Sequence, residues 1–262
     1  MEIKNSFNDE TSYVQHSLIV SKLKDKIKNY QNLEIILSEL PKGSILVGGF
    51  IRDLILDRLS LYPDIDIVIP NNSLDIGKNI AEKFSGKFLI LDQDRNIVRI
   101  IFRNFTVDIA SQTHELLAED LKSRDFTINS VGFSFNDGKL IDPANGIRDM
   151  NDSLLRSFRD ENLLDDPLRI LRCFRFVSEL NFHIEPRILE FIKLNKFRLK
   201  TVSPERIQYE LKRIVQGKEA LKTVEFLNEI KIFDWAQSYE NNHSNNLLRI
   251  NFDDFLQDEI DQ

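Results

Sequence analysis

The sequence predicts an α+β domain built on a small mixed sheet, followed by an all-helical domain. Two observations lead to this prediction. Short apolar runs of strand length alternate with amphipathic helical segments in the first part of the chain, whereas strand signals stop after about Asn151 and only helical spacing continues. We therefore expect one domain over residues 1–150 and a second over residues 151–262, and the sequence contains no internal repeat or low-complexity segment.

The N-terminal part of the first domain predicts one helix. Residues 1 to about 16 are polar, and we expect them to be frayed. Apolar residues then recur at intervals of three and four between Ser17 and Leu40, as on an amphipathic helix. Pro41 and Gly43 end this pattern, because proline and glycine interrupt helices.

The stretch Ile45–Pro70 contains the strongest polar signals. It begins with a short apolar run between glycines, which is typical of a buried strand that ends in a tight turn, and a helical pattern follows. The last part alternates as a strand does, so Asp64 and Asp66 are expected side by side on one face. The glycines and charged residues of interest in this stretch are Gly48, Gly49, Arg52, Asp53, Asp64 and Asp66.

Two carboxylates on a half-buried strand repel each other and lose solvation, and a bound Mg²⁺ removes that cost. The alternative is an edge-strand pair that faces water, since the D-x-D tripeptide is common. The glycine pair favours the metal site, because backbone N–H groups can approach a phosphate closely there. A P-loop does not fit, since Gly49-Phe50 replaces the required Lys-Ser/Thr, and the G-x-G-x-x-G of a dinucleotide fold does not occur.

The rest of the first domain predicts helices and strands around the same sheet. The expected elements are a helix from 71–73 to about 84, a hairpin of 87–91 with 96–102, a strand over 106–110, a helix over 114–121, and a hairpin of 127–135 with 139–141. Asp108 lies in one of these strands among apolar residues. It is either an outward-facing strand residue or a third carboxylate, since two metals roughly 3.5–4 Å apart need several oxygen ligands.

The segment Ser123–Asn129 carries three further polar candidates. Arg124 and Asp125 either pair with each other at the surface or serve a ligand. Asn129, which we expect to be buried in a strand, needs hydrogen-bond partners and could otherwise serve a ribose or a phosphate.

The helical domain opens on Asp166-Pro167, where Asp166 is well placed as a helix N-cap. Arg169 lies three residues further on, and Arg172 extends the row on the same side. One interpretation is a capping aspartate with a surface ion pair. The other is base recognition, because a carboxylate accepts from an exocyclic amine while a guanidinium donates to the adjacent ring atom. Such a pair accepts C and A and rejects U and G.

The composition is that of a globular protein of 262 residues, 42% hydrophobic and 29% charged, without an apolar run of membrane-spanning length. The single cysteine, Cys173, excludes an internal disulfide, and no Cys/His spacing suggests zinc. Together with a polar N-terminal segment this predicts a cytoplasmic protein without a membrane partner. The net charge of −7 argues mildly against nucleic acid, although the run Arg187–Arg213 is basic. That run is equally explained as a solvated helical face.

Seven segments, taken in order, resemble the head and neck of bacterial-type class II tRNA nucleotidyltransferases and the similar poly(A) polymerases, both of the polymerase-beta-like nucleotidyltransferase superfamily. The segments are GGFIRD, DID, VDIA, SRDFTIN, IDPANGIRDM, DDPLRILRCFRF and SPERIQYEL, and they cover roughly residues 44 to 215. One such segment is weak support, whereas the ordered set is highly specific.

The resemblance implies a polymerase-beta-like head followed by a neck, and attack of a tRNA 3′-hydroxyl on the α-phosphorus of CTP or ATP. It implies that Asp64 and Asp66 bind two Mg²⁺ ions and that Asp108 is the third catalytic carboxylate. It further implies nucleotide binding by Gly48, Gly49, Arg52, Asp53, Arg124, Asp125, Asn129, Asp166, Arg169, Arg172 and Arg175, with Ser203, Glu205 and Arg206 bracing the neck.

Three departures from the family pattern qualify this expectation. Ser123 stands where the family usually has a further arginine. The link from Asp108 to Arg124 is short, as in enzymes that add only CC, whereas other members carry a longer flexible loop that helps to switch from C to A. The chain also ends soon after the neck, so body and tail domains are expected to be largely absent. The rival interpretations are a bacterial poly(A) polymerase and a non-catalytic RNA-binding remnant.

Overall fold

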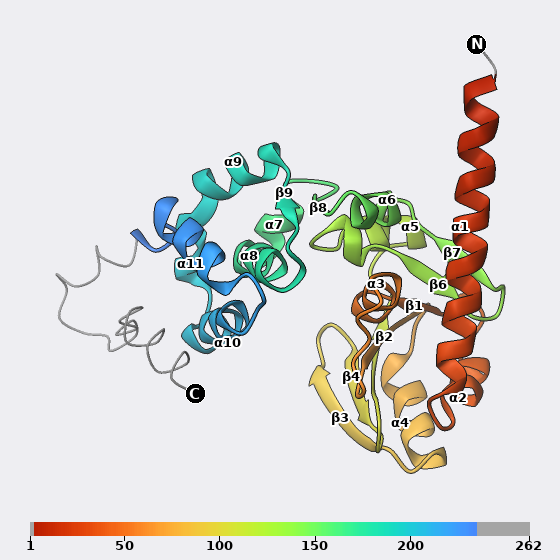
Figure 1. Ribbon diagram of the computed structural model, residues 1–262. Coiled ribbons are helices and arrows are strands. Elements are labelled where there is room, and N and C mark those ends of the chain that lie inside the picture. The colour runs from red at the N-terminus through yellow and green to blue at the C-terminus, as the bar shows by residue number, and fades with distance from the viewer. Residues whose placement is uncertain (1–2, 235–262) are drawn as a thin grey trace. The chain divides into compact units, whose positions relative to one another are not determined.

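The computed structural model describes residues 3–234, and the chain divides into two compact units, Met1–Met150 and Asn151–Gln262 (Figure 1). Among the described residues, no helix combines the length and the apolar character that crossing a membrane requires. Each unit has its own buried apolar core, with Phe50 in the first and Phe174 in the second among its largest fully buried side chains.

The first unit is built on a mixed sheet of seven strands in the order β3-β4-β5-β2-β1-β6-β7. The pair β2 and β5 is parallel and the other neighbours are antiparallel. The strands are β1 (Ile45–Val47), β2 (Asp64–Ile69), β3 (Lys87–Asp92), β4 (Ile97–Ile101), β5 (Thr106–Ser111), β6 (Gly132–Ser134) and β7 (Lys139–Ile141). The helices are α1 (Ile3–Lys28), α2 (Leu33–Glu39), α3 (Gly49–Ile55), α4 (Ser73–Lys83), α5 (Leu117–Lys122), η1 (Thr127–Asn129) and α6 (Gly146–Asn151).

The two faces of this sheet differ in character because side chains alternate along each strand. One face is apolar, with Val98 of β4 fully buried where α4 packs against β3, β4 and β5 (Figure 1). The other face carries Asp66 and Asp108 in facing positions of β2 and β5. Only part of this second face is covered, where Leu121 of α5 joins Val68 in a buried cluster.

The second unit is helical apart from a two-stranded parallel ladder. Its elements are β8 (Leu154–Leu155), α7 (Asn162–Asp165), α8 (Arg169–Leu180), β9 (His183–Ile184), α9 (Pro186–Asn195), η2 (Lys196–Thr201), α10 (Pro204–Val215) and α11 (Ala220–Glu229). Helix α8 packs against both α10 and α11. The contacts include an edge-to-face ring pair of Phe174 and Phe226, and a 2.6 Å hydrogen bond that Ser178 Oγ donates to the Ile214 carbonyl.

Two predictions for the N-terminal region are wrong. The expected single helix Ser17–Leu40 is two helices, because the chain turns at Asn32, whose φ is 69° in the left-handed region that asparagine tolerates better than most residues. The expected frayed segment is also helical from Ile3 onward, as the first part of α1. Residues 1–2 lie outside the described part of the chain.

The predicted strand 127–135 is wrong in its first half. Thr127–Asn129 forms the 3-10 turn η1, and pairing in β6 starts only at Gly132. Local side-chain hydrogen bonds explain the difference, since Asn129 Nδ2 donates to Asp125 Oδ1 at 2.9 Å and Ser130 Oγ donates to a backbone carbonyl at 3.1 Å. Such bonds compete with the strand ladder for the backbone.

Two smaller differences concern helix starts. The predicted helix 114–121 begins only at Leu117, after a turn held by polar side chains. The predicted N-cap Asp166 lies before the start of α8, whose regular part begins at Arg169. Its carboxylate nevertheless accepts a hydrogen bond from the Leu168 N–H at 3.1 Å. Asp166 therefore makes the hydrogen bond of an N-cap, although it lies three residues before the regular helix.

Candidate active site

Asp64 and Asp66 lie on one face of β2, as the alternation predicts. Exposure falls along this face from Asp64, which is exposed, through the half-buried Asp66 to the buried Val68. The buried end results from α5, whose Leu121 belongs to the same apolar cluster as Val68. The two carboxylates therefore stand where the covered part of the face gives way to the open part, accessible to solutes and supported from behind by apolar packing.

Gly48 connects β1 to α3 and lies directly against Asp66. Its φ of 75° is one that residues with a side chain rarely adopt. A Cβ atom at this position would lie 2.8 Å from Oδ2 of Asp66 and 3.2 Å from Nη1 of Arg124. The structure thus brings together the backbone of the glycine turn, one predicted carboxylate and one predicted guanidinium, which come from three separate segments of the sequence.

Asp108 occupies the position of β5 that faces Asp66. Its carboxylate is held by Arg99 of β4, with 2.8 Å from Nε to Oδ1 and 2.7 Å from Nη2 to Oδ2. This hydrogen bonding raises the pKa of Arg99 above its usual range against the opposing effect of burial, and the charges of Asp108, Asp64 and Asp66 add to the rise. Arg99 therefore stands within the field of all three carboxylates.

Arg99 was not among the residues that the sequence singled out. The available signal was a lone arginine in the middle of the apolar strand Ile97–Ile101. Its partner could not be inferred, because the contact depends on the antiparallel register that sets Arg99 opposite Asp108.

Four other predicted residues form one hydrogen-bonded network in the first unit. Arg52 donates to both oxygens of Asp53, at 2.8 and 2.9 Å, and to Oδ1 of Asn129 at 2.7 Å. Asn129 in turn donates to Asp125, which is only 5% exposed. The expected surface position of Asp125 is therefore wrong, because its carboxylate is buried. The network fixes the orientation of Arg52, whose guanidinium belongs to the helix that follows the glycine turn.

Asp166 and Arg169 are both held by neighbours in the second unit. Oδ2 of Asp166 accepts from Nη2 of Arg206 on α10 at 2.6 Å. Nη1 of Arg169 donates to the carbonyl oxygen of Asn162 at 2.6 Å. Each side chain is thus oriented by a contact outside the Asp-x-x-Arg segment itself.

Arg172 and Arg175 follow on the same helix with different surroundings. The guanidinium of Arg172 lies 5.7 Å from the centre of the Phe176 ring. Arg175 is buried, and its Nε lies 3.0 Å from Oε2 of Glu210 on α10, although these two atoms lack the alignment of a hydrogen bond. Burial lowers the pKa of Arg175, and the nearby charge of Arg172 contributes to the decrease.

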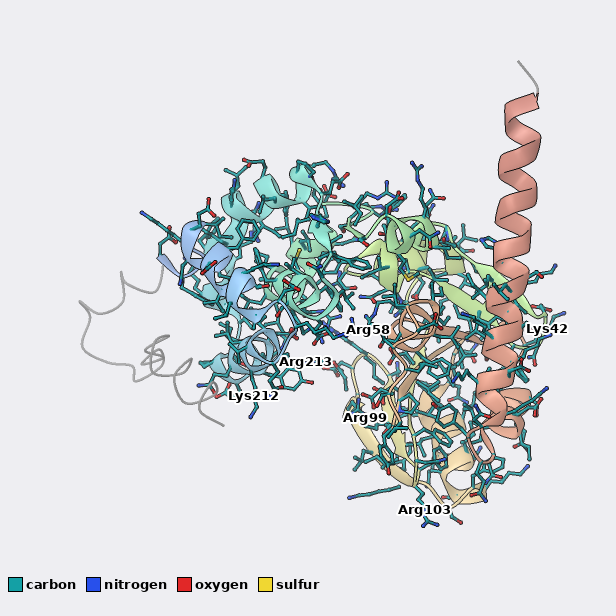
Figure 2. All side chains as sticks on the ribbon, viewed as in Figure 1. Lys42, Arg58, Arg99, Arg103, Lys212 and Arg213 are labelled. Carbon is teal, nitrogen blue, oxygen red and sulfur yellow. The ribbon has the colours of Figure 1, made fainter. Side chains whose placement is uncertain are left out.

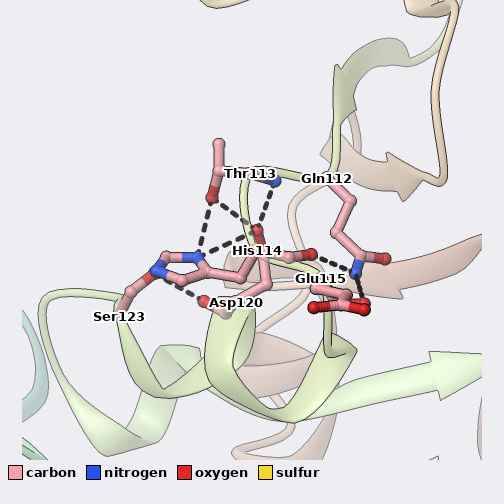
Figure 3. Close-up of polar contacts among 6 residues, drawn as sticks. All are labelled: Gln112, Thr113, His114, Glu115, Asp120 and Ser123. Atoms are coloured by element: carbon pink, nitrogen blue, oxygen red, sulfur yellow. Dashed lines mark hydrogen bonds and ion pairs between the residues drawn. The ribbon is translucent and has the colours of Figure 1, made fainter.

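Hydrogen bonds within the segment hold the short link between Asp108 and Arg124 (Figure 3). Oδ1 of Asp120 accepts from both N and Oγ1 of Thr113, at 3.0 and 2.8 Å. The Gln112 amide donates to the carbonyls of residues 114 and 115, and Ser123 Oγ donates to the Asp120 carbonyl at 2.7 Å. Ser123, the departure from the family pattern, therefore closes the last turn of α5.

The carboxylates of β2 fit a Mg²⁺ site in which a bound nucleotide would supply further oxygen ligands. Mg²⁺ in proteins is usually bound by one or two carboxylates together with substrate phosphates and water. Asp64 and Asp66 supply two such groups beside the Gly48 turn. In the part of the chain that the structure describes, no three Asp, Glu, His or Cys side chains gather closely enough to enclose a metal by themselves.

Comparison with known proteins gives consistent matches over both units. Residues 44–156 match the poly A polymerase head domain, and residues 181–237 match the probable RNA and SrmB-binding site of polymerase A. The CC-adding tRNA nucleotidyltransferase of Synechocystis sp. is 38% identical over 69% of this chain and 43% of its own length. The A-adding tRNA nucleotidyltransferase of Halalkalibacterium halodurans is 27% identical over 80% of this chain and 53% of its own length.

A solved structure of a CCA-adding enzyme with CTP aligns with a TM-score of 0.71 at 30% identity, covering 81% of this chain and 55% of that chain. The chain spans about half the length of the curated relatives it matches. The two matched ranges follow one another along the chain, and the glycine turn and paired aspartates lie within the matched head domain. On these grounds the chain belongs to the family of bacterial-type tRNA nucleotidyltransferases and poly(A) polymerases.

Proposed function

We propose that this chain carries a Mg²⁺-dependent, template-independent nucleotidyltransferase activity that adds C to the 3′ end of tRNA. The 3′-hydroxyl of the RNA loses its proton to solvent and its oxygen forms a bond to the α-phosphorus of CTP. The bond from that phosphorus to the oxygen that bridges to the β-phosphate breaks, and pyrophosphate leaves. The close approach of the Gly48 turn to Asp66 and Arg124 carries this proposal, because it sets a stretch of backbone without a side chain beside a carboxylate and a guanidinium.

In this proposal Asp64 and Asp66 hold Mg²⁺ together with phosphate oxygens of the nucleotide. Bound there, Mg²⁺ supplies Lewis-acid activation of the phosphoryl oxygen and of the attacking hydroxyl. Arg124 and the Gly48 and Gly49 backbone hold the triphosphate, and the Arg52 network keeps that turn in place. All of these residues lie in the unit of residues 1–150. We also propose the cytoplasmic location that the sequence predicts.

The second unit is proposed to read the base and to contact RNA. Asp166 accepts from the amino group of cytosine, and Arg169 donates to the adjacent ring and carbonyl acceptors. Support comes from the contacts that orient both side chains, Arg206 on Asp166 and the Asn162 carbonyl on Arg169. A side chain held in advance loses less conformational entropy when it binds its ligand.

Addition of C without A is the favoured product. The link between Asp108 and Arg124 is short, and Asp120, Gln112 and Ser123 use its polar groups for internal contacts (Figure 3). A segment tied in this way has little freedom to rearrange the site for a second base. The 38% identity to a CC-adding relative supports the same choice.

One incubation tests the proposal. A tRNA transcript that lacks its terminal CCA is incubated with Mg²⁺ and CTP alone, ATP alone, or both, and the products are sequenced. Two added C residues with no A are expected. Addition of A after C would reassign the activity to CCA addition, and A tails without C would favour a poly(A) polymerase. Asp66→Ala is expected to abolish incorporation while the circular dichroism spectrum is unchanged, and surviving incorporation would refute the metal assignment.

A further inference from the structure

A row of side chains crosses the open face of the sheet on adjacent strands. The strand registers set Leu89 of β3 beside Arg99 of β4, Arg99 beside Asp108 of β5, and Asp108 beside Asp66 of β2. Arg99 projects from this part of the sheet (Figure 2). The row leads from an exposed edge strand to one of the two proposed metal ligands, with a single guanidinium between the edge and the carboxylates.

We propose that Arg99 and the metal ion compete for Asp108, so that Arg99 holds this carboxylate before the metal binds and releases it afterwards. The inference rests on the proposed function, because it takes Asp66 as a metal ligand. Arg99 is a positioning residue in this scheme, since it acts through Asp108 rather than on the substrate.

The geometry of the pair supports competition rather than shared binding. Both oxygens of Asp108 are engaged by the two-pronged guanidinium, at 2.8 and 2.7 Å. A divalent cation that bound the same carboxylate would be a near neighbour of the guanidinium, and two cations at such short range repel each other strongly. In this proposal, Asp108 joins Asp66 in binding the metal when Arg99 moves away.

The surroundings explain why such a pair exists and how it can open. Asp108 faces Asp66, and without a counter-charge these carboxylates would repel each other. Arg99 supplies that charge from a side chain that is 35% exposed, whereas Asp108 is 17% exposed. On the edge side its neighbour Leu89 is also exposed, and in this proposal the arginine rotates toward that edge when the metal binds.

The direction in which metal affinity changes when Arg99 is replaced distinguishes competition from a supporting role. If Arg99 only supported Asp108 as a metal ligand, its replacement would weaken metal binding, by roughly 10–100-fold for typical supporting contacts. If Arg99 competes with the metal, its replacement strengthens metal binding. Arg99→Lys is the sharpest variant, because lysine keeps the positive charge but cannot make the two-pronged contact.

The experiment titrates the full chain with Mn²⁺ and follows the signal of free Mn²⁺ by electron paramagnetic resonance. The apparent Kd of Arg99→Lys is expected to be about fivefold or more below that of the unsubstituted protein, the lower range of typical coupling between competing or cooperating sites. In an Asp108→Asn background the same substitution should have no effect, since the contested carboxylate is gone. Arg103→Lys, at an exposed arginine just beyond β4, is the matched control and should leave the Kd unchanged.

Unchanged or weaker Mn²⁺ binding by Arg99→Lys overturns the inference, provided that its circular dichroism spectrum shows the native fold. An effect that persists in the Asp108→Asn background also overturns it, because Arg99 then changes metal binding through long-range electrostatics and not through its contact with Asp108. Asp66→Ala distinguishes a failure of the Arg99 inference from a failure of the proposed metal site. If it abolishes Mn²⁺ binding while Arg99→Lys has no effect, only this inference falls. If it leaves Mn²⁺ binding intact, the proposed metal site falls and the inference with it.

Discussion

Arg206 of α10 holds one oxygen of Asp166 at 2.6 Å, while the Leu168 N–H holds the other at 3.1 Å. The carboxylate is thus fixed by one contact from its own helix start and by one from a helix about 40 residues further along the chain. Because Asp166 is the proposed acceptor for the amino group of the base, its orientation depends on how α10 packs in the second unit.

Arg206→Leu is expected to reduce discrimination between CTP and UTP. The pair is partly exposed, so its loss is worth about 0.2–1 kcal/mol, which corresponds to at most about a fivefold change in the ratio of kcat/KM values. Steady-state incorporation with each nucleotide measures this ratio. Arg198→Leu, at another exposed arginine of the same unit, is the control and should not change it. An unchanged ratio for Arg206→Leu would show that Asp166 needs no support from α10.

Gly48→Ala is expected to abolish nucleotide incorporation. The added Cβ would be strained at a φ of 75° and would lie 2.8 Å from Oδ2 of Asp66, so the carboxylate must move. Gly43→Ala is the matched control, because its φ is 90° and its Cβ would lie 3.3 Å from Pro70 instead. Both variants should lose about 1–2 kcal/mol of stability from backbone strain, measured by urea unfolding. Equal activity of the two variants would contradict the role of the Gly48 turn.

Glu210→Ala is expected to destabilise the protein by about 3–5 kcal/mol, because it removes the counter-charge that lies 3.0 Å from the buried Arg175. Burial raises the pKa of Glu210 and lowers that of Arg175, so solvation already opposes the charged forms of both groups. The double variant Arg175→Met with Glu210→Leu should therefore recover most of the loss in a urea unfolding experiment.

The control for this pair is Glu190→Ala, which removes an exposed partner of Lys193 and should cost less than about 1 kcal/mol. If the double variant were as unstable as Glu210→Ala, the cost would come from lost packing rather than from an isolated charge.

Asp120→Ala is expected to loosen the link between Asp108 and Arg124. Asp120 is 7% exposed and accepts two hydrogen bonds from Thr113, so its loss leaves a partly buried N–H without its acceptor, at about 1–3 kcal/mol. Hydrogen exchange of the backbone amides in residues 112–116 should become faster. Glu115→Ala, at an exposed acidic residue of the same segment, should leave the exchange rates as they are. Unchanged exchange in Asp120→Ala would mean that other contacts hold the link.

The parts of the fold that depend on local pattern could be predicted from the sequence. The strand Ile45–Val47, the glycine turn and the alternating strand Asp64–Ile69 lie where their apolar spacing and their glycines indicate. Predictions failed where a local pattern was interrupted by side-chain hydrogen bonding or by a left-handed residue. Asn32 divided one expected helix, and the contacts of Asn129 replaced the start of an expected strand with a 3-10 turn.

The sequence by itself determined that Asp64 and Asp66 share one face, because the two-residue period of a strand is a local property of the backbone. The tertiary structure decided what surrounds them. Strand order and register set Asp108 opposite Asp66 and give Arg99 to Asp108, and helix packing gives Arg206 to Asp166. Such contacts join residues that are distant in the chain or depend on register, and periodicity along one segment carries no information about which other segment lies beside it.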